Sequence, residues 1–390
     1  MYTIFGNNPF ICISTRCGFF FRESQALNLS ITPRTRVLQS LNHQESDIVP
    51  YHIPIDMACM KVLEDEGEAT QCLLQNLDNH LPYWLIESEK HWIEPGVYSD
   101  DFGCVWKELD DVPHLIDPPL KEPDLSDYHF PDLDYGRYFS GMDDFFASTR
   151  NHYRLCCLAL GFFDRGWALR GFENFLSDVV LSQKFVEELL DQLVAMYSQL
   201  IDQIAQHPFD GIRFADDWGY QRGVTIGASR WRNLIMPGLR AIFEYAHQKG
   251  LTVMVHSDGD LTEIIPDLIQ LGVQILNPIQ PECMDILWLK KEYGNHICFN
   301  GGISSQSTIP WGTPRQIQKE VMACLKYLGK DGGYIIGPTK SLNLDAPLEN
   351  CLAVLTSILN QPYPSKGYVS SERVPERVQA LWSVYSKFHV

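Results

Sequence analysis

Apolar runs alternate with amphipathic helical patterns along most of this chain. RLCCLALGFF (154–163), GIRFADD (211–217), LTVMVHSDG (251–259), VQILNPIQ (273–280), ICFNGG (297–302) and GYIIGPTK (333–340) predict buried strands. Helical spacing between and after them predicts helices over 181–204, 229–249, 260–271, 314–328 and 347–359, and a short helix ending at 293. Earlier in the chain, a helix from Pro33, capped by Thr32, precedes a strand over 48–55.

Strands that are apolar on both faces and alternate with helices are typical of a parallel sheet covered by helices. Seven such strands are visible, and residues 60–150, where only 97–106 resembles a strand, have room for an eighth. The pattern therefore predicts an α/β fold, a TIM (β/α)8 barrel, with a doubly wound open sheet as the alternative. We expect residues 1–31 to be an N-terminal extension and 32–390 to form one barrel domain.

The net charge limits the kinds of partner to expect, and the cysteine spacing indicates the redox compartment. The formal net charge is −18, so the average surface repels phosphate backbones and anionic membranes, and no apolar run reaches the roughly 20 residues that span a bilayer. Eleven cysteines without disulfide-type spacing favour a reducing compartment. We expect a cytoplasmic enzyme with a small-molecule substrate, no nucleic-acid or membrane partner, and a homodimeric assembly.

Active sites of (β/α)8 barrels are built from the loops that follow the strands, so polar residues at predicted strand ends are the candidates for chemistry. Asp56 and Asp101 are two of them, although each is equally well explained as a helix cap or a turn residue. The candidates at strand ends are Asp56, Asp101, Asp216, Asp217, His256, Asp258, Gln280, Glu282, Cys283, Gly301, Gly302 and Lys340.

Two adjacent carboxylates, Asp216 and Asp217, follow a buried strand directly. Like charges at such a position push one pKa upward, which suits proton transfer near neutral pH. The alternative is that the pair caps the following segment. We also expect Gln221, Gln280 and Gly301 to contact the substrate.

His256 and Asp258 stand two residues apart at a strand end, so their side chains point the same way if the extended conformation continues. With Glu282 or Cys283 they would form a plausible zinc ligand set. Lys340 supports a rival interpretation, in which its ammonium pairs with Asp258 in a pocket without metal.

Several segments in order resemble the uroporphyrinogen decarboxylase superfamily, which includes cobalamin-dependent methyltransferases. The resemblance runs from about Thr32 to Asn360 and rests on TPRTRVLQSLNHQESDIVPYHI, FDRGWALRGFENFL, ADDWGYQ, HSDGDLTEIIPDLIQLGVQILNPIQPECMD, NGGISSQSTIPWGTP and GGYIIGPTKSLNLDAP. It implies a TIM barrel. The arginine-rich MRQAGR segment of true decarboxylases is replaced here by YHIPIDMAC, which favours a diverged member.

The resemblance implies two chemistries. In the methyltransferase branch, zinc held by a His, a Cys two residues on and a Cys near the last strand activates a thiol; these positions fall on His256, on Asp258, and at or beside Lys340. This hypothesis has Asp217 handling a proton, and a corrinoid supplied from outside the chain, free or on a carrier protein, because the chain has no DxHxxG segment. The alternatives are a decarboxylase without cofactor, using Asp56 or Asp101 as the acid, and a non-catalytic binding barrel.

Overall fold

The computed structural model describes residues 31–109, 112–159 and 161–361. The predicted N-terminal extension, residues 1–31, lies outside the described residues except for Ile31. Two compact units divide the chain: a first unit of Met1–Pro82, Asp144–Tyr153 and Pro278–Val390, and a second unit of Tyr83–Asp143 and Arg154–Asn277. The prediction of one domain over 32–390 stays a prediction.

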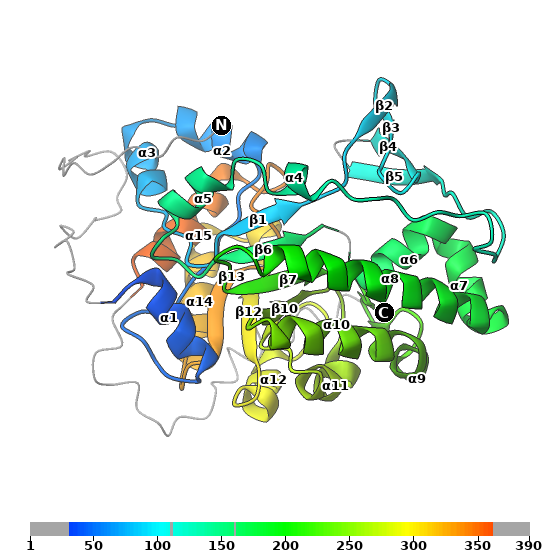
Figure 1. Cartoon of the computed structure of the whole chain (residues 1–390). Coiled ribbons are helices and arrows are strands. Elements are labelled where there is room, and N and C mark those ends of the chain that lie inside the picture. The colour runs from blue at the N-terminus through cyan, green and yellow to red at the C-terminus, as the bar shows by residue number, and fades with distance from the viewer. Residues whose placement is uncertain (1–30, 110–111, 160, 362–390) are drawn as a thin grey trace. The chain divides into compact units, whose positions relative to one another are not determined.

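The second unit contains a run of neighbouring parallel strands (Figure 1). Their order is β1 (Tyr83–Ile86), β6 (Leu155–Leu158), β7 (Gly211–Ala215), β10 (Thr252–His256) and the start of β11 (Ile275–Ile279). Every residue of β6 is buried, as expected for a strand covered on both faces. The register pairs Leu158 with Phe214, and Phe214 with Val255. The pairing brings the carboxyl ends of these strands to one edge.

Helices follow these strands in the same unit. They are α6 (Phe162–Arg170), α7 (Phe172–Leu181), α8 (Gln183–Ile204), α9 (Ala228–Arg230) continued by the π-helix Trp231–Ile235 and α10 (Met236–Gln248), and the 3-10 turn Thr262–Ile264 with α11 (Ile265–Gln270). The short helix α4 (Tyr135–Tyr138) precedes β6 in this unit, and most of α5 (Met142–Ser148), from Asp144 on, belongs to the first unit. The long helix α8 buries Leu189, Leu193 and Tyr197 and lies beside α10 (Figure 1).

Two predicted boundaries in this unit were wrong. The strand expected over 154–163 ends at Leu158, and Phe162 already starts α6, because backbone N–H groups of that first turn bond to Asp216. The helix expected from 181 to 204 is two helices, α7 and α8, which separate at Ser182. Helical periodicity continues across such a break, so the pattern alone does not reveal it.

A small antiparallel sheet forms the insertion between β1 and β6. It contains β2 (His91–Glu94), β3 (Val97–Ser99), β4 (Val105–Leu109) and β5 (Val112–Asp117), and it stands apart from the parallel strands in Figure 1. The strand expected over 97–106 is therefore the hairpin β3–β4, whose turn Asp100 closes by accepting the N–H groups of Phe102 and Cys104. A further pair, β8 (Gly219–Tyr220) and β9 (Gly223–Val224), follows β7.

The first unit holds the remaining parallel strands, β12 (Cys298–Ile303) and β13 (Tyr334–Pro338), which are fully buried and pair with each other. The strand expected over 48–55 is reduced to two parallel bridges, Tyr51 to Ile336 and Ile55 to Leu342. Prolines 50 and 54 lack the N–H groups that a regular ladder needs. The helices of this unit are α1 (Pro33–Leu41), α2 (Met57–Asp65), α3 (Glu68–Gln75), α12 (Ile286–Tyr293), α13 (Thr308–Trp311), α14 (Pro314–Ala323), the π-helix Cys324–Leu328 and α15 (Leu348–Leu359).

The seven parallel strands and the bridged segment around Tyr51 to Ile55 make eight parallel segments, and helices follow them along the chain. This is the element order of a (β/α)8 barrel, so the predicted α/β fold is confirmed. The eighth strand, which the sequence pattern did not reveal, is β1. Its four residues, YWLI, are apolar but form too short a run to stand out, and Tyr83 and Leu85 are exposed.

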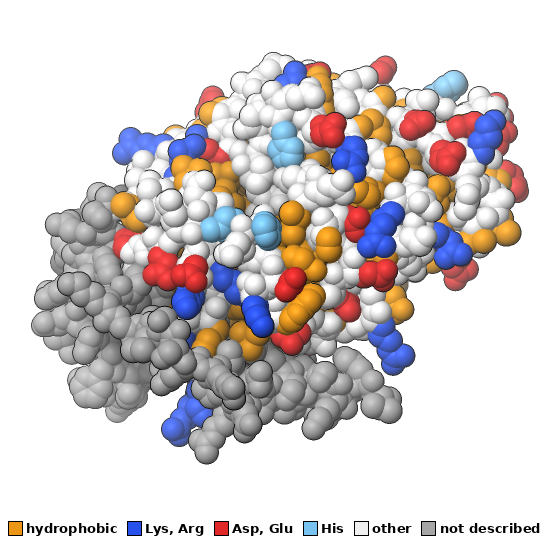
Figure 2. All heavy atoms as spheres, turned by 90° about the horizontal axis from the view of Figure 1, so that it is seen from below, with side chains coloured by type: hydrophobic (Ala, Val, Ile, Leu, Met, Phe, Trp, Pro, Cys, Tyr) orange, Lys and Arg blue, Asp and Glu red, His pale blue; other side chains and the backbone are white. Residues whose placement is uncertain are grey.

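On the face drawn in Figure 2, acidic and basic side chains of the described residues are interspersed. None of the helices within 31–109, 112–159 and 161–361 has the length and apolar character needed to cross a membrane. The nine cysteines in these ranges are all free thiols.

Candidate active site

Asp216 and Asp217 both follow β7, but the first side chain is buried and the second is exposed. Asp216 is 1% exposed and accepts hydrogen bonds from the backbone N–H groups of Phe163 (3.0 Å) and Asp164 (2.8 Å) and from Nε1 of Trp218 (2.7 Å). It thereby satisfies the otherwise unpaired amides at the start of α6. Asp217 is exposed. The capping alternative therefore describes Asp216, whereas Asp217 is available for chemistry.

The position of Asp216 explains why residue 161 is a glycine. A Cβ atom at this position would collide with Cβ of Asp216 and with the carbonyl oxygen of Ala215, so only glycine lets the start of α6 approach β7 this closely. A larger residue would move the first turn of α6 away from Asp216.

Asp217 meets His256 and Asp258 at the ends of the neighbouring strands β7 and β10. The register pairs Ala215 with His256, and the backbone N–H of Asp258 donates to Oδ1 of Asp217 at 2.9 Å. One potential ligand atom from each of Asp217, His256 and Asp258 lies within 4.8 Å of the others. We call these three residues the strand-end triad.

The two loops that carry the triad are locked together. The fully buried Ser257 Oγ accepts the N–H groups of Trp218 (3.0 Å) and Gly219 (3.3 Å). Gly259, at φ 90°, packs against the backbone of Gly219 so closely that a Cβ at either glycine would collide with the opposite loop. The loops are therefore held in one arrangement by backbone contacts, which fixes the spacing of the two acids.

His256 is prepared as a neutral ligand. Its Nδ1 lies 2.7 Å from Oδ1 of Asn277, the residue beside it on β11. Because a side-chain carbonyl oxygen only accepts, Nδ1 carries the proton and Nε2 keeps its lone pair. Burial, reinforced by the nearby Arg213 guanidinium, lowers the pKa of His256 to about 4. At neutral pH the imidazole is uncharged and can bind a metal ion or accept a proton.

Asp164, in the first turn of α6, was not among the predicted site residues. It is buried, and its carboxylate accepts Nε1 of Trp167 (2.7 Å) and the backbone N–H of Asp217 (3.2 Å). Burial, with the negative charge of Asp217 nearby, raises the pKa of Asp164 to about 7. The signal was its position just beyond the strand RLCCLAL, where the sequence pattern extended the strand through Phe163 and hid the loop.

The triad fits a catalytic zinc site in its donor chemistry. Zinc binds imidazole nitrogen and carboxylate oxygen, and catalytic sites use three protein ligands while leaving a position open for substrate. The hydrogen bond from His256 to Asn277 is the kind of outer contact that orients a metal-bound imidazole. Asp217 and Asp258 are both exposed, so solvent and substrate reach the carboxylates.

Glu282 and Cys283, the other predicted metal ligands, belong to the first unit. Glu282 is buried, and its Oε1 accepts Ser304 Oγ–H and the N–H of Gln306. Cys283 is half-buried, with its Sγ 3.6 Å from Oε1 of Gln280. Neither residue occurs in the clusters of three or more metal-binding side chains found within the described residues, whereas Asp217 completes the cluster with His256 and Asp258.

The remaining candidates of the first unit make hydrogen bonds in which at least one partner is a backbone group. Asp56 caps α2 by accepting the N–H of Cys59 at 2.7 Å. Gly301 is buried at φ 115°, with its carbonyl bonded to Tyr334 OH. The carbonyl of the buried Gln280 accepts the N–H of Met284. Lys340 is exposed and bonds through its backbone to Ser305 Oγ. Its pairing with Asp258 stays a prediction.

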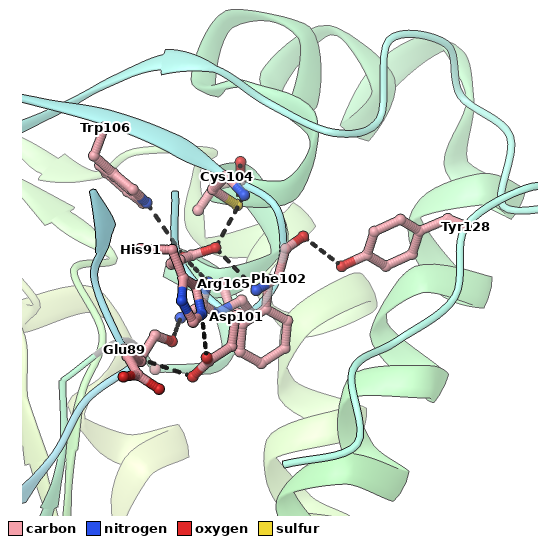
Figure 3. A network of polar contacts seen from close by, with 12 residues as sticks. Glu89, His91, Asp101, Phe102, Cys104, Trp106, Tyr128 and Arg165 are labelled. Atoms are coloured by element: carbon pink, nitrogen blue, oxygen red, sulfur yellow. Dashed lines mark hydrogen bonds and ion pairs between the residues drawn. The ribbon is translucent and has the colours of Figure 1, made fainter. Parts of the chain in front are cut away.

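Two candidates of the second unit lie away from the triad cluster. Gln221 is exposed in the turn between β8 and β9. Asp101 forms a separate cluster with Glu89 and His91 on the insertion, drawn in Figure 3. Substrate contacts of Gln221, Gln280 and Gly301 stay predictions.

Comparison with known proteins identifies the family. Residues 162–360, 199 of the 390 residues, match the family model described as uroporphyrinogen decarboxylase (URO-D). The chain belongs to the uroporphyrinogen decarboxylase family. The matched range of this URO-D chain contains the complete triad, together with Asp164 and Asn277.

Among solved structures, this URO-D chain is similar to a methyltransferase from Methanosarcina mazei, with a TM-score of 0.63 and 16% sequence identity over 84% of this chain and 98% of the other. At that identity the likeness concerns the fold, which agrees with the predicted TIM barrel. No curated protein matches the sequence.

Proposed function

We propose that this URO-D family member is a methyl-transferring enzyme whose strand-end triad binds zinc. The observation that carries the proposal is that Asp217, His256 and Asp258 bring three donor atoms within 4.8 Å of one another, beside an imidazole whose Nδ1 is already bonded to Asn277. The methyltransferase from Methanosarcina mazei, which has a similar fold, supports the reaction class.

Each residue of the triad region has a defined task in this proposal. Asp217 and Asp258 supply negative charge that favours a dication, and His256 supplies a neutral nitrogen. Bound zinc would lower the pKa of a coordinated thiol and so supply a thiolate at neutral pH. Asp164, which bonds to the backbone of Asp217 and has a pKa of about 7, can hold the proton that the thiol loses.

A corrinoid, free or on a separate carrier protein, is the methyl source we propose, since the chain has no corrinoid-binding DxHxxG segment. The overall transfer moves a methyl cation equivalent from cobalt to sulfur, which leaves both electrons of the cobalt–carbon bond on cobalt. The substrate is accordingly a small thiol.

The first test is metal content, measured by inductively coupled plasma mass spectrometry on protein purified without chelators, together with methylcobalamin demethylation by dithiothreitol, followed by absorbance. We expect about one zinc per chain and thiol-dependent demethylation, both lost in His256→Ala and both retained in the control Asp101→Asn. Demethylation that persists after zinc is removed would contradict the proposal.

Decarboxylation is the second candidate, and one observation favours it. The buried Asp164, with a pKa of about 7, is protonated in much of the population at neutral pH and can protonate a carbanion formed by loss of CO2. This residue is better placed for the task than Asp56, which caps a helix, or Asp101, which is paired with Arg137. A decarboxylase would release CO2 from its substrate normally in His256→Ala and fail in Asp164→Asn.

A further inference from the structure

A cavity of about 220 Å³ lies in the second unit, next to the ends of β1 and β6. Ile86 and Leu158, the last residues of these strands, line it together with Leu200 of α8. Aromatic side chains form much of the remaining wall. They are Tyr98, Phe102, Trp106, Tyr138 and Tyr197.

A buried ion pair forms one side of this cavity. Arg165 and Asp100 are each 5% exposed, and Arg165 Nη1 donates to Oδ2 of Asp100 at 2.7 Å. Asp100 also accepts Nε1 of Trp106 (3.2 Å) and, through Oδ1, the N–H groups of Phe102 (3.0 Å) and Cys104 (2.9 Å). Figure 3 shows Trp106, Cys104 and Arg165 gathered around this point. With four donors, the carboxylate of Asp100 has little capacity left for a ligand.

Hydrogen-bond donors remain available on the cationic side chains. Of the five N–H groups of Arg165, one bonds to Asp100 and one, at 3.3 Å, to Ser88 Oγ within the described residues. Lys90, which also lines the cavity, donates one of its three N–H groups to Glu108 Oε1 at 2.7 Å. The cavity therefore offers more donors than acceptors, which favours a ligand with acceptor atoms.

The aromatic faces, by contrast, already hold cations of the protein. The guanidinium of Arg165 lies 3.9 Å from the ring centre of Phe102, Nζ of Lys90 lies 4.9 Å from that of Tyr98, and the guanidinium of Arg137 lies 4.6 Å from that of Tyr138. A cationic ligand would find these faces occupied and would be repelled by Lys90 and Arg165. Glu87, the second acid of the lining, is exposed.

We propose that this cavity binds a compact organic anion, a carboxylate carried on an apolar body about the size of one aromatic ring. A protein cavity of about 150 Å³ holds benzene, so 220 Å³ accommodates a ring and a carboxylate group. The charge-assisted hydrogen bonds come from Lys90, Arg165 and Ser88, and the aromatic walls enclose the ring. The inference does not depend on zinc or on methyl transfer.

Three isosteric probes test the charge preference: benzoate, benzamide and benzamidine, titrated into the full-length protein with ligand-observed NMR. We expect benzoate to bind about tenfold or more tightly than benzamidine, with benzamide between them, because only the carboxylate uses the charged donors fully. Benzamidine binding as tightly as benzoate, or no binding of benzoate, would overturn the proposal.

Variants locate the bound probe. Met196 lines the cavity from a half-buried position on α8, so Met196→Trp should fill the space and abolish benzoate binding while the melting temperature stays near the parent value. Lys90→Gln, at a side chain that is 42% exposed, should weaken benzoate about tenfold, and Lys184→Gln, at one that is 89% exposed, should change nothing. Affinity that is unaltered in Lys90→Gln, or lost in His256→Ala because the carboxylate sits on the triad's metal, would overturn it.

Discussion

Two clusters of the second unit contain the same kinds of side chain, one histidine and two acids, and both are close enough to hold a metal ion. The strand-end triad of Asp217, His256 and Asp258 and the insertion cluster of Glu89, His91 and Asp101 each place three potential ligand atoms within 4.8 Å. Their surroundings differ. Asp101 already receives Arg137 Nη2 (3.0 Å), Tyr138 OH (3.2 Å) and the N–H of Glu89 (3.0 Å), as Figure 3 shows in part.

The two histidines also differ in which ring nitrogen is hydrogen-bonded. In the triad, Asn277 holds Nδ1 of His256, so that Nε2 keeps a lone pair. In the insertion cluster, Nε2 of the exposed His91 is itself bound to Asp101 at 3.1 Å. In the insertion cluster, a metal ion would therefore have to displace the contacts of Asp101 with Arg137 and with His91. Among residues 31–109, 112–159 and 161–361, no such contact is found at Nε2 of His256. Suitable residue types at a suitable spacing therefore form a metal site only if the negative charge and the lone pairs of the ligand atoms are not already engaged by other side chains.

The scaffold explains this difference. His256 is the last residue of β10, and Asp217 lies two residues after the end of the neighbouring parallel strand β7. The register of β10 is fixed by pairs on both sides, with β7 and β11. His91 lies on the short antiparallel strand β2, whose residues are all exposed, and Asp101 lies in the turn between β3 and β4. Parallel strands of the barrel hold their end residues more rigidly than an exposed hairpin does.

The strongest test of the comparison replaces each histidine by alanine. His256→Ala should lower zinc affinity by more than about 100-fold, because loss of a ligand exceeds the 10- to 100-fold effect of an outer contact. His91→Ala is the matched control and should retain the affinity of the parent. Isothermal titration with zinc measures both affinities, and equal losses in the two variants would show that the two clusters do not differ as zinc sites.

The next test concerns the imidazole orientation. Asn277→Ala removes the acceptor for Nδ1 of His256 and should weaken zinc binding by roughly 10- to 100-fold. Asn277→Asp keeps an acceptor oxygen at this position and should restore most of the affinity. If Asn277→Ala and Asn277→Asp bind zinc with equal affinity, the hydrogen bond to Nδ1 does not orient His256 for metal binding.

The pH dependence of stability separates His256 from Asp164. The pKa of His256 is lowered from 6.5 to about 4, so between these pH values the unfolded chain binds a proton that the folded chain does not, and stability falls as pH falls. The pKa of Asp164 is raised from 3.8 to about 7, so the folded chain binds the extra proton and stability rises as pH falls through the same window.

The two contributions oppose each other, so single variants should reveal them. On going from pH 7 to pH 5, His256→Gln should gain stability relative to the parent and Asp164→Asn should lose it, each by about 1 kcal/mol or more. Urea unfolding at both pH values measures the change, and His80, whose pKa burial lowers to about 3, acts equally in all three proteins. Parallel pH trends in the two variants would show that these groups are not perturbed as described.

The smallest expected effect tests whether Arg137 suppresses the insertion cluster. In a His256→Ala background, Arg137→Met frees Asp101 from its ion pair and should strengthen residual zinc binding by no more than about fivefold, since a partly exposed ion pair is worth at most ~1 kcal/mol. Arg230→Met, at an exposed arginine outside both clusters, is the control. A larger gain would mean that the two clusters differ mainly in this single cation.

Much of the fold could be predicted from the sequence. Buried strands at 211–215, 252–256, 275–279, 298–303 and 334–338 follow from apolar runs, and the helices after them from helical spacing. β1 was not predicted because its apolar run is only four residues long. The strand over 48–55 was overestimated because prolines 50 and 54 lack the N–H groups that a regular ladder needs. These misses have local causes that periodicity does not encode.

The candidate site was predicted less completely. His256 and Asp258 follow from their place after a strand, and the Asp216–Asp217 pair from its position, but the division of labour within that pair depends on α6, more than 40 residues earlier in the chain. Asn277, on the neighbouring strand, and Asp164 were not foreseen, because only the register and the turn into α6 bring them to the triad.

The alternation of strands and helices and the polar residue types at the strand ends follow from the sequence alone, because hydrophobic periodicity is a local property. Three features follow only from the folded chain: Asp217 completes the triad, Asp216 caps α6, and Asn277 fixes the proton of His256. Each of these depends on the distance between residues far apart in the chain, and strand register and loop packing set that distance.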